Sequence, residues 1–378
     1  MTGKAADNSR MRLAGLIRKE VYQIMRDPSA IGIAFLLPVL LLLIFGYGVS
    51  LDAEHVPVGI VVEKPSPEAT NFTSGFQNNR YFEPIAFDSI QEAEKALMER
   101  RVTAIVWTRN NFTKKLLSTS DSPIGVIVNG VDANQARIIK GYIMGVWMRW
   151  LDKFARAQGA SLNVPVMVKK RIWFNAAVRS RNFLVPGLIA VIMTLIGGML
   201  TSMVVAREWE RGTMEALLVT PVRKKEIILG KIIPYFVLGM GGMMLSVIMT
   251  VWVFQVPFRG SFIALTFSSA LFMLTAIGLG LIISVAAGSQ FVAGQIAIVI
   301  TFLPAFILSG FVFDIGSMPA PIQGITHIVA ARYFVSILQT LFLAGDIWHI
   351  YIVNWLWLTG MALFFFMVIR RKFHKRLQ

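Results

Sequence analysis

The ionisable side chains that could bind a partner gather in one short stretch of this 378-residue chain. The stretch Arg207–Lys231 reads REWERGTMEALLVTPVRKKEIILGK and holds ten ionisable residues, whereas Phe183–Ala206 before it and Ile232–Phe254 after it hold no Asp, Glu, Lys or Arg. Carboxylate, guanidinium and ammonium groups in such a mixture can pair with complementary charges on another protein. The pattern predicts a docking surface at the point where the chain leaves a membrane and re-enters it.

The first half of this stretch has the spacing of a short helix with two faces. Glu208, Arg211 and Glu215 follow one another at i, i+3 and i+7, which would place them on one helical face. Apolar residues follow from Leu217, and Pro221 ends the helix. The charge pairs expected along the helix are Arg207–Glu210–Arg211 and Arg211–Glu215. A partner that grips this helix could use it as a lever; the alternative is a solvated connector.

Motifs for catalysis or for a cofactor do not occur in the sequence. Gly230-Lys231 is followed by Ile232, so the chain has no phosphate-binding GxxxxGK[S/T] loop, and it has no HExxH metal motif. Its four histidines are scattered, and the lack of cysteine excludes disulfides and thiolate metal sites. We therefore expect no enzymatic activity, metal or cofactor in this chain.

Composition indicates a mainly α-helical membrane protein. Hydrophobic residues make up 55% of the chain and charged residues only 15%, against about a quarter charged in soluble domains. Segments without charge recur at about the 20 residues that cross a bilayer as a helix. The six transmembrane helices that we predict are residues 31–50, 183–206, 232–254, 262–287, 291–313 and 349–369.

The distribution of basic residues gives the expected topology. Seventeen Lys and Arg residues lie in segments 1–30, 207–231 and 370–378, whereas the short loops on the other face hold only Arg259 and Arg332. This positive-inside bias predicts that both termini and the charged loop are cytoplasmic. The net charge of +16 is then explained by topology and anionic lipid headgroups, and a nucleic-acid partner is not expected.

The N-terminal segment 1–30 is expected to form a cytoplasmic amphipathic helix at the membrane interface, over residues 10–27. Its apolar side would hold Leu13, Leu16, Ile17, Ile24 and Met25, and the side chains that could reach headgroups are Arg12, Arg18, Lys19 and Arg26. The alternative is a solvated basic tail. The apolar run that follows, Ile31–Val49, is too long for a secretory signal and reads as a retained anchor.

The segment 51–182 has the pattern of a small α/β domain outside the membrane. The expected strands are Val56–Val62, Pro84–Phe87, Val102–Trp107 and Gly125–Asn129. The expected helices are Pro67–Asn79, Ser89–Arg101, Asn110–Ser118 and Ala133–Ala157. Ser89 and Glu92 have the spacing of a helix-capping box.

The segment 314–348 allows two interpretations. Ala330–Ala344 is apolar enough to enter a bilayer, but it contains Arg332, and a full span here would place the C-terminus outside. Re-entrant or interfacial helices keep the charge bias, so we predict these on the periplasmic side. Arg332 is then expected at the outer interface, where Arg332 and Asp314 or Asp346 would be within reach of headgroups or of each other.

Small residues recur every four positions along the fourth predicted span. Ala276, Gly280, Ser284 and Gly288 form this stripe, which would let another helix approach closely, either within the chain or in a second subunit. The six spans hold no Asp or Glu. Because ion-coupled antiporters use carboxylates inside the membrane, a separate partner is the expected energy source.

The charged loop resembles the cytoplasmic coupling element of one transporter family, the permease subunits of ABC-2 type ATP-binding-cassette exporters. That element reads RExERGTxExLLxTP, and Arg207–Pro221 is similar to it throughout. Supporting similarities are Phe45-Gly-Tyr-Gly48, Phe183-Leu-Val-Pro186-Gly187, Leu308-Ser-Gly-Phe311 and Ala331-Arg332-Tyr-Phe334. The likeness covers nearly the whole chain and is nearest to a bacterial multidrug-efflux branch with a large periplasmic insert.

The resemblance implies six spans, a second permease subunit, re-entrant helices after the fifth span, and a location in the bacterial inner membrane. It also implies ATPase subunits that use ATP and grip the coupling element, here Arg207, Glu208, Glu210, Arg211, Gly212, Thr213, Glu215 and Leu217. A periplasmic adaptor and an outer-membrane channel are further expected partners. The large insert favours efflux or a protein-assisted export route over polysaccharide and lipopolysaccharide export. Alternatives that the residues leave open are a membrane sensor or scaffold and an ion-coupled antiporter.

Overall fold

The computed structural model describes residues 2–48, 55–77, 79–116, 124–131, 133–158, 179–214, 219–220 and 222–372. The chain divides into two units, one made of Leu51–Arg171 and the other of Met1–Ser50 with Ile172–Gln378. We describe the two units separately.

The first unit is built on a four-stranded sheet in the order β2-β1-β3-β4. The strands are β1 (Val56–Val62), β2 (Phe82–Phe87), β3 (Ala104–Thr108) and β4 (Ile124–Val128). β1 runs parallel to β2 and β3, whereas β4 is antiparallel to β3. The near-continuous apolar sequence VPVGIVV of β1 fits its central place, because a strand covered on both faces is apolar on both.

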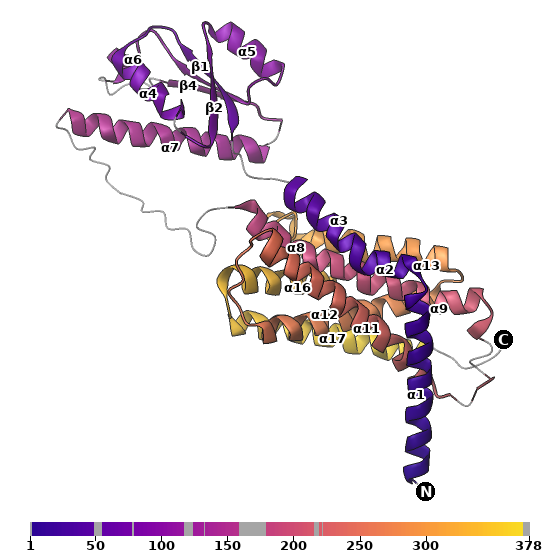
Figure 1. The fold of residues 1–378 in the computed structure, drawn as a ribbon. Coiled ribbons are helices and arrows are strands. Elements are labelled where there is room, and N and C mark those ends of the chain that lie inside the picture. Colours follow the sequence, from indigo (N-terminus) through magenta and orange to yellow (C-terminus); the bar gives the residue numbers. More distant parts are fainter. Residues whose placement is uncertain are drawn as a thin grey trace. The chain divides into compact units, whose positions relative to one another are not determined.

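Helices cover both faces of this sheet (Figure 1). α4 (Pro67–Gln77), α6 (Phe112–Leu116) and α7 (Ala133–Ala157) enclose a core that includes Phe72, Phe76 and Trp150. α5 (Ile90–Met98) packs on the opposite face. It begins at Ser89, whose hydroxyl accepts a hydrogen bond from the backbone N–H of Glu92. The unit is therefore an α/β domain whose elements lie within a few residues of those expected.

The second unit contains six helices that are long and apolar enough to cross a membrane. These candidate spans are Pro28–Gly48, Ser180–Glu210, Lys224–Val253, Phe262–Ala286, Gln290–Leu308 and Trp348–Lys372. Their main helices are α2 (Pro28–Ile31), α3 (Leu37–Leu43), α8 (Ser180–Thr194), α9 (Leu200–Glu210), α11 (Lys224–Ile248), α12 (Phe262–Ala286), α13 (Gln290–Ala297), α14 (Leu303–Leu308) and α17 (Trp348–Lys372). The expectation of six spans agrees with these helices.

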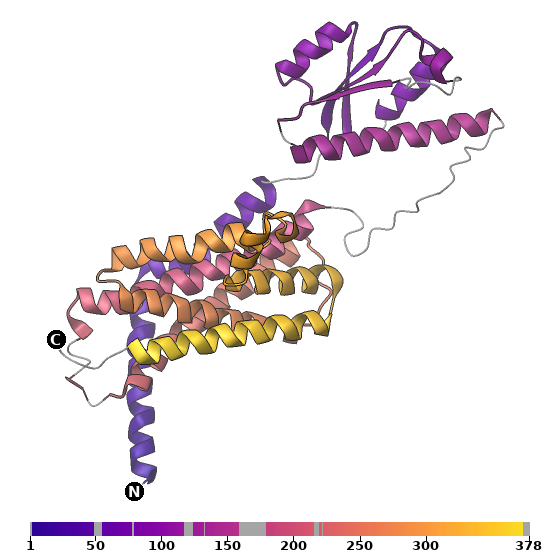
Figure 2. The ribbon, with the colours of Figure 1, turned by 180° about the vertical axis from the view of Figure 1, so that it is seen from behind.

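The second span lies at the centre of this unit. In its most apolar window 89% of the residues are buried, against 17% in the sixth span, so α8 and α9 form the core and α17 presents most of its surface outward. Figures 1 and 2 show α12 between these elements, and α12 packs against both α9 and α17.

The small-residue stripe on α12 contacts the second span of the same chain. A Cβ on Gly280 would lie 2.5 Å from the carbonyl oxygen of Gly198, so the two backbones are nearly in contact. The Ser284 hydroxyl accepts hydrogen bonds from the backbone N–H groups of Val205 (2.9 Å) and Ala206 (3.1 Å). Gly288 does not belong to this contact, because it lies beyond the end of α12 and faces open space.

A bent helical pair precedes the sixth span. α15 (Ala320–Thr326) meets the run formed by α16 (Ala330–Gln339) and its continuation to Ala344 at an angle of 88°. Arg332 binds the carbonyl oxygen of Gln323 (3.3 Å) and the hydroxyl of Thr326. Among the described residues no ion pair joins Arg332 to an aspartate, because the turn between α15 and α16 supplies nearer acceptors, and its expected reach to headgroups stays a prediction.

We predict that Gly280→Ala destabilises the protein by about 1–3 kcal/mol, because the added methyl group overpacks the contact between α12 and the second span. The matched control is Gly360→Ala in α17, where nothing lies within 4 Å of the new Cβ and the gain in helix propensity should stabilise slightly. Thermal unfolding of the purified variants in detergent measures both. Equal midpoints for Gly280→Ala and the parent protein would contradict the close packing.

Candidate functional site

The N-terminal helix α1 (Thr2–Met25) is attached to the helix bundle by ion pairs. α1 packs along α11, where a Cβ on Gly230 would lie 2.9 Å from Cβ of Leu16. Arg12 and Lys19 bind carboxylates of α11 and α9, contacts that the sequence did not predict. Asp27 ends this segment and caps α2 by accepting hydrogen bonds from the backbone N–H groups of Ser29 and Ala30.

Five charged side chains are buried in the described part of the chain, and all lie where α1, α9 and α11 meet. These are Glu20, Arg207, Glu208, Glu226 and Lys231. Burying a charge is costly unless it is paired and hydrogen-bonded. The arrangement of partners around these residues is therefore the main feature of this part of the molecule.

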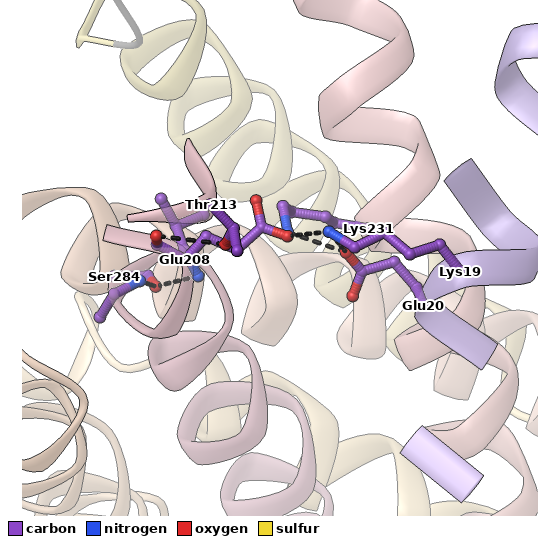
Figure 3. Close-up of polar contacts among 8 residues, drawn as sticks. Lys19, Glu20, Glu208, Thr213, Lys231 and Ser284 are labelled. Carbon is purple, nitrogen blue, oxygen red and sulfur yellow. Dashed lines mark hydrogen bonds and ion pairs between the residues drawn. The ribbon is translucent and has the colours of Figure 1, made fainter. Parts of the chain in front are cut away.

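Lys231 is bound by residues of two other helices. We call the set made of Lys19, Glu20, Glu208 and Lys231 the junction cluster (Figure 3). The Lys231 Nζ lies 2.9 Å from Oε1 of Glu20 and 3.0 Å from Oε1 of Glu208. Lys19 binds the same oxygen of Glu208. One carboxylate comes from α1 and the other from α9, so the lysine on α11 ties three helices together.

Glu208 is held at several points. Its side chain is 3% exposed, its Oε1 accepts from both lysines, and its backbone carbonyl accepts a hydrogen bond from the Thr213 hydroxyl at 3.3 Å. Its other carboxylate oxygen, Oε2, is buried and has no hydrogen-bond partner among the described residues. An unpaired buried oxygen is unusual, because most buried polar atoms are satisfied.

Two further ion pairs flank the junction cluster. Arg207 Nη1 lies 2.8 Å from Oδ2 of Asp27, and its Nε donates to the side chain of Gln290 at 3.2 Å. Partial burial acts to raise the pKa of Asp27, but the hydrogen bond from Ser29 and the charge of Arg207 outweigh it, so that the pKa lies below its usual value. On the other side, Arg12 binds both carboxylate oxygens of Glu226, at 3.0 and 3.2 Å.

The structure contradicts the shared helical face predicted for the charged loop. α9 ends at Glu210, and Gly212 adopts a left-handed conformation with φ of +67°, so one continuous helix does not run through this segment. Glu208 points into the protein, whereas Arg211 is exposed. Glu215 and Leu217 lie outside the described residues.

The expected pair of Arg207 with Glu210 is replaced by longer-range contacts, whereas Glu215, the expected partner of Arg211, lies outside the described residues. Arg207 binds Asp27, and Glu210 accepts a hydrogen bond from the backbone N–H of Gln290 at 3.0 Å. Sequence reasoning missed Lys19 and Lys231 as partners of Glu208, and Glu20 as the second partner of Lys231. One signal was present: Glu20 lies four residues from both Leu16 and Ile24, within the apolar face of α1.

The geometry supports a mechanical role. Separating any one helix from the junction cluster would leave a charge buried without its partner, which is strongly unfavourable. α1 and the ends of the second and third spans should therefore move together.

Comparisons with known proteins agree with the membrane architecture. The sequence profile described as ABC-2 family transporter protein matches residues 29–370. The probable multidrug ABC transporter permease YbhS of Escherichia coli is 43% identical over 367 residues, which are 97% of each chain. The probable multidrug ABC transporter permease YbhR of the same organism is 28% identical over 334 residues, covering 88% of this chain and 90% of the relative. The inner membrane transport permease YhhJ is 28% identical over 299 residues, covering 78% and 79%.

We predict that Lys231→Met destabilises the protein by about 3–5 kcal/mol, because it leaves the buried carboxylates of Glu20 and Glu208 without their main partner. The control is Lys225→Met on the exposed start of α11, which should change stability by no more than about 0.5 kcal/mol. Thermal unfolding in detergent gives both values. Adding Glu208→Gln to Lys231→Met should recover part of the lost stability. Equal stability of Lys231→Met and Lys225→Met would contradict the junction cluster.

Proposed function

This chain belongs to the ABC-2 family of transporter proteins, and from that premise we propose that it is the permease subunit of an exporter driven by a separate ATP-binding subunit. The proposed substrate is drug-like or amphipathic and moves out of the cytoplasm or the inner membrane. The multidrug permease names of two relatives support this choice of substrate class.

The junction cluster is the observation that carries the proposal. An ATPase that pushed on the loop after α9 would act on Glu208, and Glu208 is bound through Lys231 to α11 and, through the same lysine and Glu20, to α1. The movement would then pass to the second and third spans as a unit. The side chains proposed to meet the ATPase are the exposed Glu210, Arg211 and Thr213, with Glu215 and Leu217 beyond them.

The charge distribution favours this source of energy over ion coupling. The buried charged side chains of the described residues lie at or beside the ends of the spans, and the acidic ones are paired with Lys or Arg. A carboxylate that carried ions or protons would be expected inside the membrane-spanning segments. A separate ATPase is therefore the better-supported driver.

We further propose the topology and the assembly. Both termini and the charged loop would be cytoplasmic, the α/β unit would lie in the periplasm, and the bent pair α15–α16 would be re-entrant. A second permease subunit, identical or related, would complete the translocation path. A periplasmic adaptor and an outer-membrane channel would complete the export route.

We predict that Arg211→Ala and Glu215→Ala weaken co-purification of the ATPase and lower efflux in intact cells. If either side chain becomes a buried, hydrogen-bonded charge at the interface, its loss costs about 2–5 kcal/mol of association free energy. Membrane insertion should be unchanged, because neither residue lies in a span. Lys95→Ala on α5, whose side chain is 73% exposed, is the control for the loss of a positive charge in Arg211→Ala. Parental efflux and co-purification in both variants would show that the loop is only a connector.

We also predict that single cysteines label according to this topology. The chain has no cysteine of its own, so each introduced thiol reports one position. A cysteine at Ser74 on α4 should react with a membrane-impermeant maleimide in spheroplasts, and one at Thr213 should react only after the membrane is opened. Both residues are exposed. Labelling at position 213 in intact spheroplasts would contradict the proposed topology.

A further inference from the structure

A basic cavity of about 570 Å³ lies beside the junction cluster. Its walls include Lys19, Arg26, Asp27, Arg207, Arg211 and Gln290. Asp27 directly precedes the first candidate span, Arg211 directly follows the second, and Gln290 begins the fifth. The cavity is therefore placed where three spans reach the same surface of the membrane.

The cavity carries more positive than negative charge. Four of its lining residues are Lys or Arg, and one, Asp27, is acidic. Arg207 is paired with Asp27 and Lys19 with Glu208, but Arg26 and Arg211 have no carboxylate partner among the described residues. Guanidinium groups bind phosphate oxygens through paired N–H donors, so the two unpaired arginines are suited to an anionic phosphate.

An apolar surface adjoins the cavity on α1 and α2. Tyr22 lines the cavity and is 49% exposed, Met25 next to Arg26 is 67% exposed, and Ile31 is 41% exposed. A helix of this kind at a membrane surface places its apolar side chains among the acyl chains. A soluble anion would make no use of this surface, whereas a lipid would use both the charge and the apolar edge.

We propose that the cavity binds the phosphate headgroup of an anionic phospholipid from the adjacent leaflet. Arg26 and Arg211 bind the phosphate oxygens, and the acyl chains lie along Tyr22, Met25 and Ile31. The bound phosphate faces Arg207 and Lys19, the two residues that connect the cavity to Asp27 and to Glu208. The lipid would therefore complete the charge balance at the edge of the junction cluster. This proposal does not depend on the transport activity.

The test is lipid retention by the full-length protein, measured by native mass spectrometry after purification in detergent. Phosphatidylglycerol should be retained in preference to phosphatidylcholine of the same acyl chains. Arg26→Gln and Arg211→Gln should each weaken retention about fivefold, the effect of one basic residue near an anionic surface. The control is Arg10→Gln, on the same helix but not in the cavity wall, which should retain the lipid as the parent does.

Three outcomes would overturn the proposal. Equal retention of both lipids would remove the need for an anionic headgroup. Displacement of phosphatidylglycerol by inorganic phosphate at equal concentration would assign the cavity to a free anion. Unchanged retention in both Arg26→Gln and Arg211→Gln would remove the two arginines from the lipid site, and loss of ATPase co-purification in Arg26→Gln would assign Arg26 to the partner protein. Because Arg26 is not among the residues proposed for ATPase coupling, the lipid result is separable from that function.

Discussion

The requirement to neutralise one buried lysine organises the charged end of the membrane unit. Lys231 is only 4% exposed, and its carboxylate partners come from two other helices, α1 and α9. Neither helix can separate from α11 without leaving charge in a medium of low dielectric constant. α1 is therefore a bound part of the bundle, although its composition alone would suit a helix that only rests on the membrane. The pairs Arg207–Asp27 and Arg12–Glu226 extend the same constraint to both sides.

The spans themselves are held by a different set of interactions. Small residues of α12 allow close backbone contact with the second span, and hydroxyl groups such as Ser246 and Thr250 donate to carbonyl oxygens four residues earlier in their own helix. These two hydroxyl groups are thus satisfied within their own helix, where the apolar layer offers no water. The unit combines an apolar, closely packed interior with a charged junction at one end. A force applied at that end would therefore act on closely packed helices.

The sequence predicted the spans well because their signal is local: a charge-free run of sufficient length needs no knowledge of its neighbours. The strands and helices of the α/β unit were equally accessible from their periodicity. The junction cluster was not, because its partners are far apart in the chain: Glu20 and Lys231 differ by 211 in residue number, and Lys19 and Glu208 by 189. The spacing of Glu208 and Arg211 describes positions around a helix, but it does not say which side faces the protein. The helix break at Gly212 then separated the residues that the spacing had grouped.

The left-handed conformation of Gly212 helps to set the direction in which the chain leaves α9. A Cβ at this position would meet nothing within 4 Å, so space does not demand glycine there. Its φ of +67° does, because other residues adopt that conformation only with strain. The direction in which the chain leaves α9 thus depends on this backbone torsion, together with the hydrogen bond from the Thr213 hydroxyl to the Glu208 carbonyl. Exposed side chains such as Arg211 could change to suit a new partner while the turn at Gly212 kept its conformation.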